Sequence, residues 1–236
     1  MSDAPPGSTP AKVAPAPRAG RASAVQSAAA PRRFVFLLLD RFTMLSFACA
    51  IEPLRLANYV AGRQLYTWVL AGETGESVTC SNGATFKLDI GLEDVDREDV
   101  VLVCGGLDVQ RATTRPVLNW LRREARRGNI IGGMCTGTYA LAKAGLLDGR
   151  RATIHWENMD GFVEEFEDVR LTKSVFVIDG NRLSTAGGTS SIDLILKIIA
   201  ADHGETLANN VADLLIYNSI RTDQDSQRLS IPTRIG

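Results

Sequence analysis

The sequence predicts an α/β fold in which a mostly parallel sheet is covered by helices on both faces. From Arg33 onward, short apolar runs alternate with segments of helical periodicity, the pattern of a sheet whose strands are joined by helices. Several of the runs are continuously apolar, as in strands buried on both faces. A single cysteine, Cys135, stands where one such strand passes into a helix.

In the first half of the chain, the apolar run at 34–39 predicts a buried strand. Helical periodicity follows at 46–60, where we expect Pro53 to break or restart the helix, because proline lacks the amide hydrogen that a helix interior needs. Further runs and turn residues predict a strand at 66–71, a hairpin over 78–87 around Ser81-Asn82-Gly83, a strand at 100–104, a helix at 115–127 and a strand at 130–134.

The second half continues the alternation. The expected elements are a short strand at 152–154, a helix at 158–166, a hairpin of 174–179 with 182–185 around Asp179-Gly180-Asn181, and helices at 190–201 and 205–220. We find no internal repeat and predict one folded body at 32–221. Residues 1–31, rich in Ala, Pro, Ser and Arg, predict a disordered tail, with a mitochondrial transit peptide as the alternative.

The charge and cysteine content restrict the class of protein. The net charge is -1, and residues 1–33 carry about +4, so the rest of the chain is acidic and is not expected to bind nucleic acid by itself. The four cysteines are widely spaced, which favours a reducing cytoplasm. No apolar run reaches the roughly 20 residues of a membrane span, and no secretory signal precedes the body. We therefore expect a cytoplasmic protein without a membrane partner.

Cys135 lies between Gly133 and Gly137 in the pattern of a nucleophile elbow, a strained strand-to-helix turn that exposes one side chain at the sheet edge. Amide groups at the start of the following helix favour a thiolate, so we expect the pKa of the Cys135 thiol to fall below about 8.5. The alternative is a cysteine that merely fills the core.

Two ionisable side chains are candidates to accompany Cys135. Glu52 stands in an apolar helical segment, where a carboxyl either faces the thiol or pairs with Arg55 one turn away. His155 follows the predicted strand at 152–154, and we expect it at the same sheet edge as the elbow. A structural hydrogen bond to the backbone is equally compatible with the position of His155.

Two glycine-rich turns also follow strands. Gly187-Gly188-Thr189-Ser190 offers amide groups to an anion or forms a tight turn with a capping hydroxyl. Gly105-Gly106-Leu107 is a candidate for oxyanion-type donors. The sequence has no phosphate-binding loop, dinucleotide fingerprint or zinc-ligand cluster. We therefore expect no cofactor and no metal.

Four segments, FLLLDRFTMLSFACAIEPLRLAN, VLVCGG, GGMCTGTYALAKAGLLDGRRATIHWEN and STAGGTSSIDLILKII, resemble the class I glutamine amidotransferase-like (ThiJ/PfpI) superfamily. The likeness is greatest to the sensor domain of one group of AraC/XylS-family transcription regulators. The resemblance implies a flavodoxin-like three-layer α/β/α sandwich that often dimerises. It also implies a reactive pair at Cys135 and Glu52. Thr136 occupies a position where the superfamily's enzymes often have histidine, which argues against hydrolase, protease or deglycase chemistry.

Regulators of this group respond to small cationic or zwitterionic nitrogen compounds such as arginine, glycine betaine and carnitine. An aromatic pocket suits a methylated ammonium group, and Trp156, Phe42 and Phe47 are candidates for its walls. A ligand carboxylate would meet the amides that follow Cys135. The predicted ligand-binding residues are Glu52, Gly106, Cys135, Thr136, His155, Trp156 and Phe42.

The resemblance implies a ligand-sensing and dimerisation domain of an AraC-type regulator of amine or amino-acid catabolism. Residues 222–236 resemble the linker that precedes a helix-turn-helix domain, and DNA binding is expected only through that domain, which this chain lacks. One alternative is a Cys135-dependent hydrolase or hydratase, of the isonitrile-hydratase or amidase type, in which Cys135, Glu52 and His155 are the catalytic candidates. A redox sensor acting through oxidation of Cys135 is a third.

Overall fold

The computed structural model describes residues 30–93 and 95–227. The predicted tail lies outside these residues except for Ala30 and Pro31, and so do residues 228–236 of the predicted linker. Within the described residues, no helix is long and apolar enough to cross a membrane.

A six-stranded sheet forms the centre of the fold, in the order β2-β1-β5-β6-β10-β9. Its neighbouring strands are parallel except for β9, which runs antiparallel to β10. This is the doubly wound, flavodoxin-like arrangement that the alternation of strands and helices indicates. The strands are β1 (Arg32–Leu38), β2 (Tyr66–Ala71), β5 (Val100–Cys104), β6 (Ile130–Met134), β9 (Phe176–Asp179) and β10 (Arg182–Thr185).

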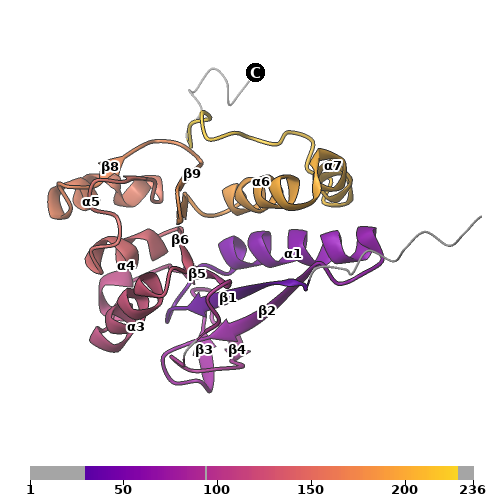
Figure 1. Ribbon diagram of the computed structural model, residues 1–236. Helices are drawn as coiled ribbons and strands as arrows, with labels where there is room; N and C mark the ends of the chain where they lie inside the picture. Colours follow the sequence, from indigo (N-terminus) through magenta and orange to yellow (C-terminus); the bar gives the residue numbers. More distant parts are fainter. Residues whose placement is uncertain (1–29, 94, 228–236) are drawn as a thin grey trace, which may run out of the picture. The chain divides into compact units, whose positions relative to one another are not determined.

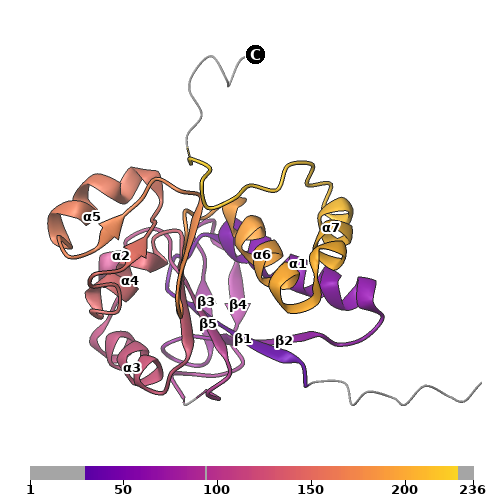
Figure 2. The ribbon, with the colours of Figure 1, turned by 45° about the horizontal axis from the view of Figure 1, so that its top comes forward.

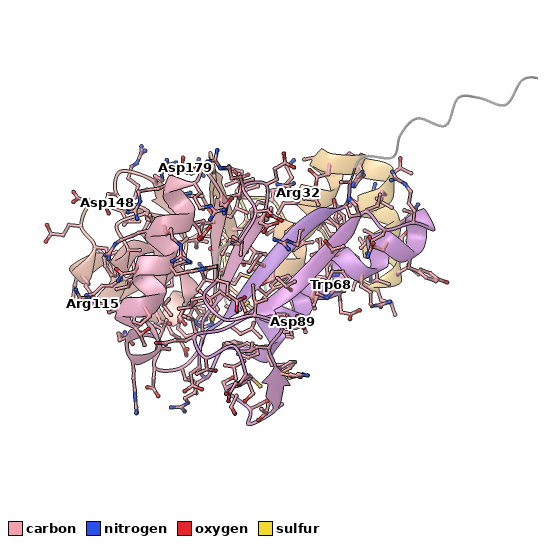
Figure 3. The ribbon with its side chains drawn as sticks, turned by 60° about the horizontal axis from the view of Figure 1, so that its bottom comes forward. Arg32, Trp68, Asp89, Arg115, Asp148 and Asp179 are labelled. Atoms are coloured by element: carbon pink, nitrogen blue, oxygen red, sulfur yellow. The ribbon has the colours of Figure 1, made fainter. Side chains whose placement is uncertain are left out.

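Helices cover the two faces of the sheet (Figures 1 and 2). α1 (Met44–Ala61), α6 (Ser190–His203) and α7 (Glu205–Leu214) lie on one face, and α3 (Arg115–Arg126) and α4 (Gly137–Lys143) lie on the other. Each face has its own apolar core, which explains why the central strands are apolar on both sides. The edge strand β2 carries Trp68, labelled in Figure 3.

Strand register brings the carboxyl ends of three strands together. Leu38 of β1 is opposite Cys104 of β5, and Cys104 is opposite Met134 of β6. The residues that follow these three positions, including Cys135, therefore lie along one edge of the sheet, where open α/β sheets place their ligands.

The helix α1 departs from the sequence prediction, because it continues through Pro53 without a break or a restart. Pro53 is buried, so packing of α1 against the sheet holds the helix together despite the missing hydrogen bond. The helix ends at Gly62, which has a left-handed conformation with φ 61° and donates its N–H to the carbonyl of Tyr59.

Several shorter elements lie outside the main sheet. The predicted hairpin consists of β3 (Ser77–Thr79) and β4 (Thr85–Lys87). The expected strand at 152–154 is instead β7 (Arg151–Ala152), which pairs with β8 (Arg170–Leu171) in a separate two-stranded sheet. The edge of the main sheet opposite β2 is formed by the hairpin of β10 and β9. The remaining short elements are α2 (Val109–Ala112), η1 (Trp156–Asn158) and α5 (Met159–Glu165).

The last predicted helix is shorter than expected, since α7 ends at Leu214 and not at 220. Residues 215–227 form an irregular segment that passes over α6 and returns toward β9 (Figures 1 and 2). We call this segment the strap. Its end is fixed by hydrogen bonds from the N–H of Val175 to the carbonyl of Asp225 and from the N–H of Gln227 to the carbonyl of Lys173.

Candidate functional site

Cys135 has the strained backbone of a nucleophile elbow. It follows β6 and directly precedes the first turn of α4, and its φ of 56° is rarely adopted by residues other than glycine. Its N–H donates to the carbonyl of Thr185 at 3.0 Å. The sharp turn predicted from the sequence is therefore present.

The glycines on either side of Cys135 are required by close packing of the backbone. A Cβ on Gly133 would lie 2.5 Å from Cα of Thr138. A Cβ on Gly137 would overlap the carbonyl group of Val103 in the neighbouring strand β5. The G-x-Cys-x-G pattern is thus explained by contacts of the turn with α4 and β5.

The Cys135 thiol is buried, with 6% of the residue exposed. Its Sγ lies 3.7 Å from Oγ1 of Thr43. Burial raises the pKa of the Cys135 thiol, against the opposing effects of Thr43, the Thr136 amide and Ser46. The expectation of a lowered pKa was wrong, because loss of solvent outweighs the hydrogen bonds that the elbow and α1 supply.

Glu52 does not accompany the thiol but forms the ion pair with Arg55 that was the alternative prediction. Its Oε2 accepts from Arg55 Nε at 2.8 Å, and the Glu52 side chain is 46% exposed. The α1 residue that interacts with Cys135 is Ser46. Ser46 is completely buried and accepts a hydrogen bond from the N–H of Gly188 at 2.7 Å. The sequence does not single out Ser46, because its role depends on the direction in which it faces from α1 and a serine at that position has no distinctive pattern.

His155 and Trp156 lie in a more open segment, whose printed link to the elbow is the charge of Glu157 on the Cys135 thiol. They follow β7, so the reason for expecting them at the main sheet edge was wrong. The N–H of Thr153 nevertheless donates to Ser184 Oγ at 2.9 Å and holds the segment against β10. The His155 and Trp156 rings are 5.7 Å apart, and Trp156 is 41% exposed. Nδ1 of His155 lies 3.6 Å from a carboxylate oxygen of Glu157, whose charge also raises the pKa of Cys135.

The other predicted aromatic residues have a structural position. Phe42 and Phe47 are buried, and their ring centroids are 5.8 Å apart in an edge-to-face arrangement. Phe86 of β4 packs against both rings. Phe42 is thus part of the apolar core and has no exposed surface to offer a ligand.

Most amide groups of the glycine-rich turns donate to acceptors within the protein. Gly105 donates its N–H to the carbonyl of Met134, and Gly187 donates to Thr185 Oγ1 at 3.1 Å. Thr136 Oγ1 donates to the carbonyl of Gly106 at 2.7 Å, which joins the elbow to the loop after β5. The Gly187-Gly188 segment is a tight turn whose two glycine amides are occupied within the protein. The expected capping hydroxyl is not seen, because the N-cap residue Thr189 makes no side-chain capping hydrogen bond.

A buried carboxylate on α6 was not predicted at all. Asp193 of α6 is completely buried, and both its carboxylate oxygens accept hydrogen bonds from the strap. Arg221 donates through its backbone N–H at 2.7 Å and through Nε at 3.0 Å, and the Tyr217 hydroxyl donates at 3.0 Å. Burial raises the pKa of Asp193, with Arg221 and Tyr217 opposing it. The partners are 24 and 28 residues away in sequence, which no local pattern reveals.

Comparisons with known proteins agree with this architecture. Residues 32–201 match the DJ-1/PfpI family. The chain is 41% identical over 206 residues to the HTH-type transcriptional regulator GbdR of Pseudomonas aeruginosa, covering 87% of this chain and 56% of GbdR. It is 44% identical over 203 residues to the HTH-type transcriptional regulator CdhR of the same species, covering 86% of this chain and 60% of CdhR. The chain thus spans little more than half the length of these relatives.

A solved structure has the same fold. The crystal structure of an AraC family transcriptional regulator from Pseudomonas putida superposes with a TM-score of 0.69 at 28% sequence identity. The match covers 78% of this chain and all of that one.

Proposed function

The chain belongs to the DJ-1/PfpI family, and from this premise we propose that it is the ligand-sensing and dimerisation domain of an AraC-type transcription regulator in the cytoplasm. The similarity to GbdR, CdhR and the Pseudomonas putida regulator supports the proposal. In it, DNA binding belongs to the helix-turn-helix region of such a regulator. The single observation that carries the proposal is the strap, which is hydrogen-bonded both to the turn before α6 and to the segment before His155.

The chemistry of the elbow favours binding over catalysis. A raised thiol pKa keeps Cys135 protonated at neutral pH, whereas a nucleophilic cysteine must be a thiolate. The neighbours that interact with its sulfur include the hydroxyls of Thr43 and Ser46, neither of which is a general base at neutral pH. Thr136 follows Cys135, and its hydroxyl is committed to the Gly106 carbonyl.

We place the ligand at the mouth of the elbow and take its class from the family resemblance, as a small amine or amino acid. Trp156 offers a partly exposed aromatic face, and Glu157 adds a negative charge beside it. Both features suit a methylated or protonated nitrogen. The other residues of this proposed site are Gly106, Cys135, Thr136 and His155. Glu52 and Phe42 are left out, since the first pairs with Arg55 and the second is buried.

One contact of the strap connects it to the turn before α6. Arg221 donates to Thr189 Oγ1 at 2.9 Å, next to Gly188, whose N–H donates to Ser46 Oγ. Ser46 in turn interacts with the Cys135 thiol. A ligand that moves Cys135 or Ser46 would therefore act on the first turn of α6 and on Arg221.

The end of the strap contacts the segment before His155. The side-chain amide of Gln227 donates through Nε2 to Thr153 Oγ1 and to the Ile154 carbonyl, both at 2.9 Å. These two residues immediately precede His155 and Trp156. The strap is thereby fixed to each side of the candidate site. In our proposal, ligand binding changes these anchors and so reorients the helix-turn-helix region of the regulator.

The second candidate function is a Cys135-dependent hydratase or amidase, which the strained elbow conformation of Cys135 favours. A thermal-shift screen separates the two, using glycine betaine, carnitine, L-arginine and an alkyl isonitrile with the wild-type chain and Cys135→Ala. A ligand present at a hundredfold excess over its Kd stabilises the folded state by about 2.7 kcal/mol.

We expect stabilisation by an amine or amino acid that persists in Cys135→Ala without product formation. Trp156→Ala should weaken that binding if the aromatic face holds the nitrogen. Product that forms with wild type and vanishes with Cys135→Ala would overturn the sensor proposal and support the enzyme. Sedimentation of the purified chain tests the dimer.

A further inference from the structure

A cavity of about 370 Å³ lies at the sheet edge next to the elbow. It is formed by the residues that follow β1, β2 and β5, together with the β3–β4 hairpin and the beginning of α3. The strand order reverses between β1 and β5, and this switch point is where open parallel sheets bind ligands. The volume is within the range of small-molecule sites. Cys135 is not among the lining residues, so we call this the switch-point cavity.

Charged groups of both signs line the cavity above an apolar floor. The floor includes Leu38, Val78 and Leu88, which are buried. The ionisable lining residues are Asp40, Arg41, Glu73, Asp108 and Arg111. With three carboxylates and two guanidinium groups, the lining has a net charge of about -1 at neutral pH.

Arg41 and Asp108, which both line the cavity, form an ion pair, and both have an unusual backbone. Their φ angles are 57° and 52°, a left-handed conformation that costs non-glycine residues roughly 1–2 kcal/mol each. Hydrogen bonds lock one of them in place: Arg41 donates its N–H to the Thr79 carbonyl at 2.8 Å and accepts from the Leu107 N–H at 3.1 Å. Strained residues that face each other in a cavity are typical of ligand clamps.

The lining offers partners for both signs of charge on a ligand. Arg41 and Arg111 supply planar guanidinium groups suited to a carboxylate. Thr114, the N-cap of the twelve-residue helix α3, also lines the cavity and adds the positive end of that helix. Arg115, the first residue of α3, is labelled in Figure 3. Asp108, Asp40 and Glu73 are the corresponding acceptors for a cationic nitrogen.

We propose that the switch-point cavity binds a small zwitterion, with its carboxylate on Arg41 and Arg111 and its ammonium group on Asp108 and Glu73. The ligand opens the Arg41–Asp108 pair and satisfies both partners. A singly charged molecule would satisfy one and leave the other unpaired, so zwitterions are favoured over simple acids and amines. This inference rests on the proposed function only for the choice of probe compounds, and it concerns a site separate from the elbow.

Two interlocked loops separate the cavity from the elbow. Phe42 and Gly106 form an isolated antiparallel bridge, and Thr43 donates its N–H to the Gly105 carbonyl at 3.0 Å. Thr43 also contacts the Cys135 thiol. Displacement of Arg41 or Asp108 by a ligand is therefore transmitted to the elbow within one or two residues along each loop.

Isothermal titration of the whole chain with L-arginine and glycine betaine tests the inference, with acetate and trimethylamine as singly charged comparisons. The variants are Arg41→Met, Asp108→Asn and, for the elbow, Trp156→Ala, and Arg55→Met is the matched control because it also removes an exposed ion pair. Arg41 and Asp108 side chains are about half exposed, so their replacement should leave the fold intact. Circular dichroism checks this.

We expect saturable binding of at least one zwitterion, weakened roughly tenfold or more by Arg41→Met and by Asp108→Asn. Binding should be unchanged in Arg55→Met, and acetate and trimethylamine should not compete. Binding that survives both cavity variants but is lost in Trp156→Ala would place the ligand at the elbow, which overturns this inference and leaves the proposed function standing. Absence of saturable binding by both zwitterions would also overturn it, whereas the proposed function would still be decided by the thermal-shift screen with its other compounds and by the turnover assay with Cys135→Ala.

Discussion

Gly187 lies directly behind Cys135: a Cβ on the glycine would be 2.6 Å from the Cβ of the cysteine and 2.9 Å from Ser46 Oγ. Real Cβ atoms do not approach so closely, so the turn before α6 fits against the elbow only because it has no side chain. This contact joins β6, β10 and α1 at a single point beside the thiol.

Replacement of Gly187 by Ala should therefore destabilise the protein more than the backbone conformation alone requires. Gly187 has φ 87°, and Gly83 in the hairpin turn has φ 90° with no atom near its Cβ position, which makes Gly83→Ala the matched control. We expect a loss of about 1 kcal/mol for Gly83→Ala and about 3 kcal/mol for Gly187→Ala, because crowding adds to strain. Urea denaturation measures both, and equal losses would contradict the crowding argument.

The pH dependence of Cys135 reactivity should follow its raised pKa. The neutral thiol is favoured in the folded state, so this contribution to stability is fully present below the unfolded pKa of about 8.5 and is lost as pH rises through the folded value. Alkylation by iodoacetamide, followed by peptide mass spectrometry, should still accelerate above pH ~9 in folded protein. The same cysteine in urea should level off near its ordinary pKa. A plateau below pH ~8 in the folded chain would mean an activated thiolate.

Ser46→Ala and Glu52→Gln distinguish the two α1 residues that were candidates to face the thiol. Ser46→Ala removes a group that lowers the pKa of Cys135 and leaves the Gly188 amide without its acceptor. We expect slower alkylation of Cys135 at pH ~8 and a loss of about 1–3 kcal/mol in unfolding free energy. Glu52→Gln should change neither by a measurable amount, since its ion pair is exposed. A large effect of Glu52→Gln on alkylation would restore the paired-carboxylate hypothesis.

Asp193→Asn should loosen the strap. The NH2 group of the asparagine would replace one carboxylate oxygen and would face the donor groups of Arg221 and Tyr217. We therefore expect the unfolding free energy to fall by about 1–3 kcal/mol and trypsin to cleave faster after Arg221. Asp202→Asn is a control on the same helix, because Asp202 pairs with Arg32 near the surface. Cleavage at equal rates in the two variants would argue against Asp193 as the anchor.

The fold could be predicted from the sequence because the buried strands of a parallel sheet are apolar throughout. The runs at 66–71, 100–104 and 130–134 coincide with β2, β5 and β6. The run at 152–154 predicted a strand but not its partner. Its short length leaves sheet membership to tertiary packing, and packing places it with β8.

The candidate site was only partly predictable. The flanking glycines identify the elbow at Cys135, because close backbone approach has a sequence signature. The sign of the thiol pKa shift depends on burial, and the choice between Ser46 and Glu52 depends on the direction each faces from α1. The switch-point cavity and the Asp193–Arg221 pair unite residues from distant segments, so neither has a local pattern.

The burial of Asp193 sets a lower limit on where this domain can be cut. A fragment that ended with the last helix, at Leu214, would keep the buried carboxylate and remove Tyr217 and Arg221, the partners that compensate it. Such a fragment would contain every helix and strand of the main sheet and still fold poorly. The smallest autonomous unit therefore extends past its regular secondary structure, to at least Arg221, and deletion series of related chains should be planned from that residue.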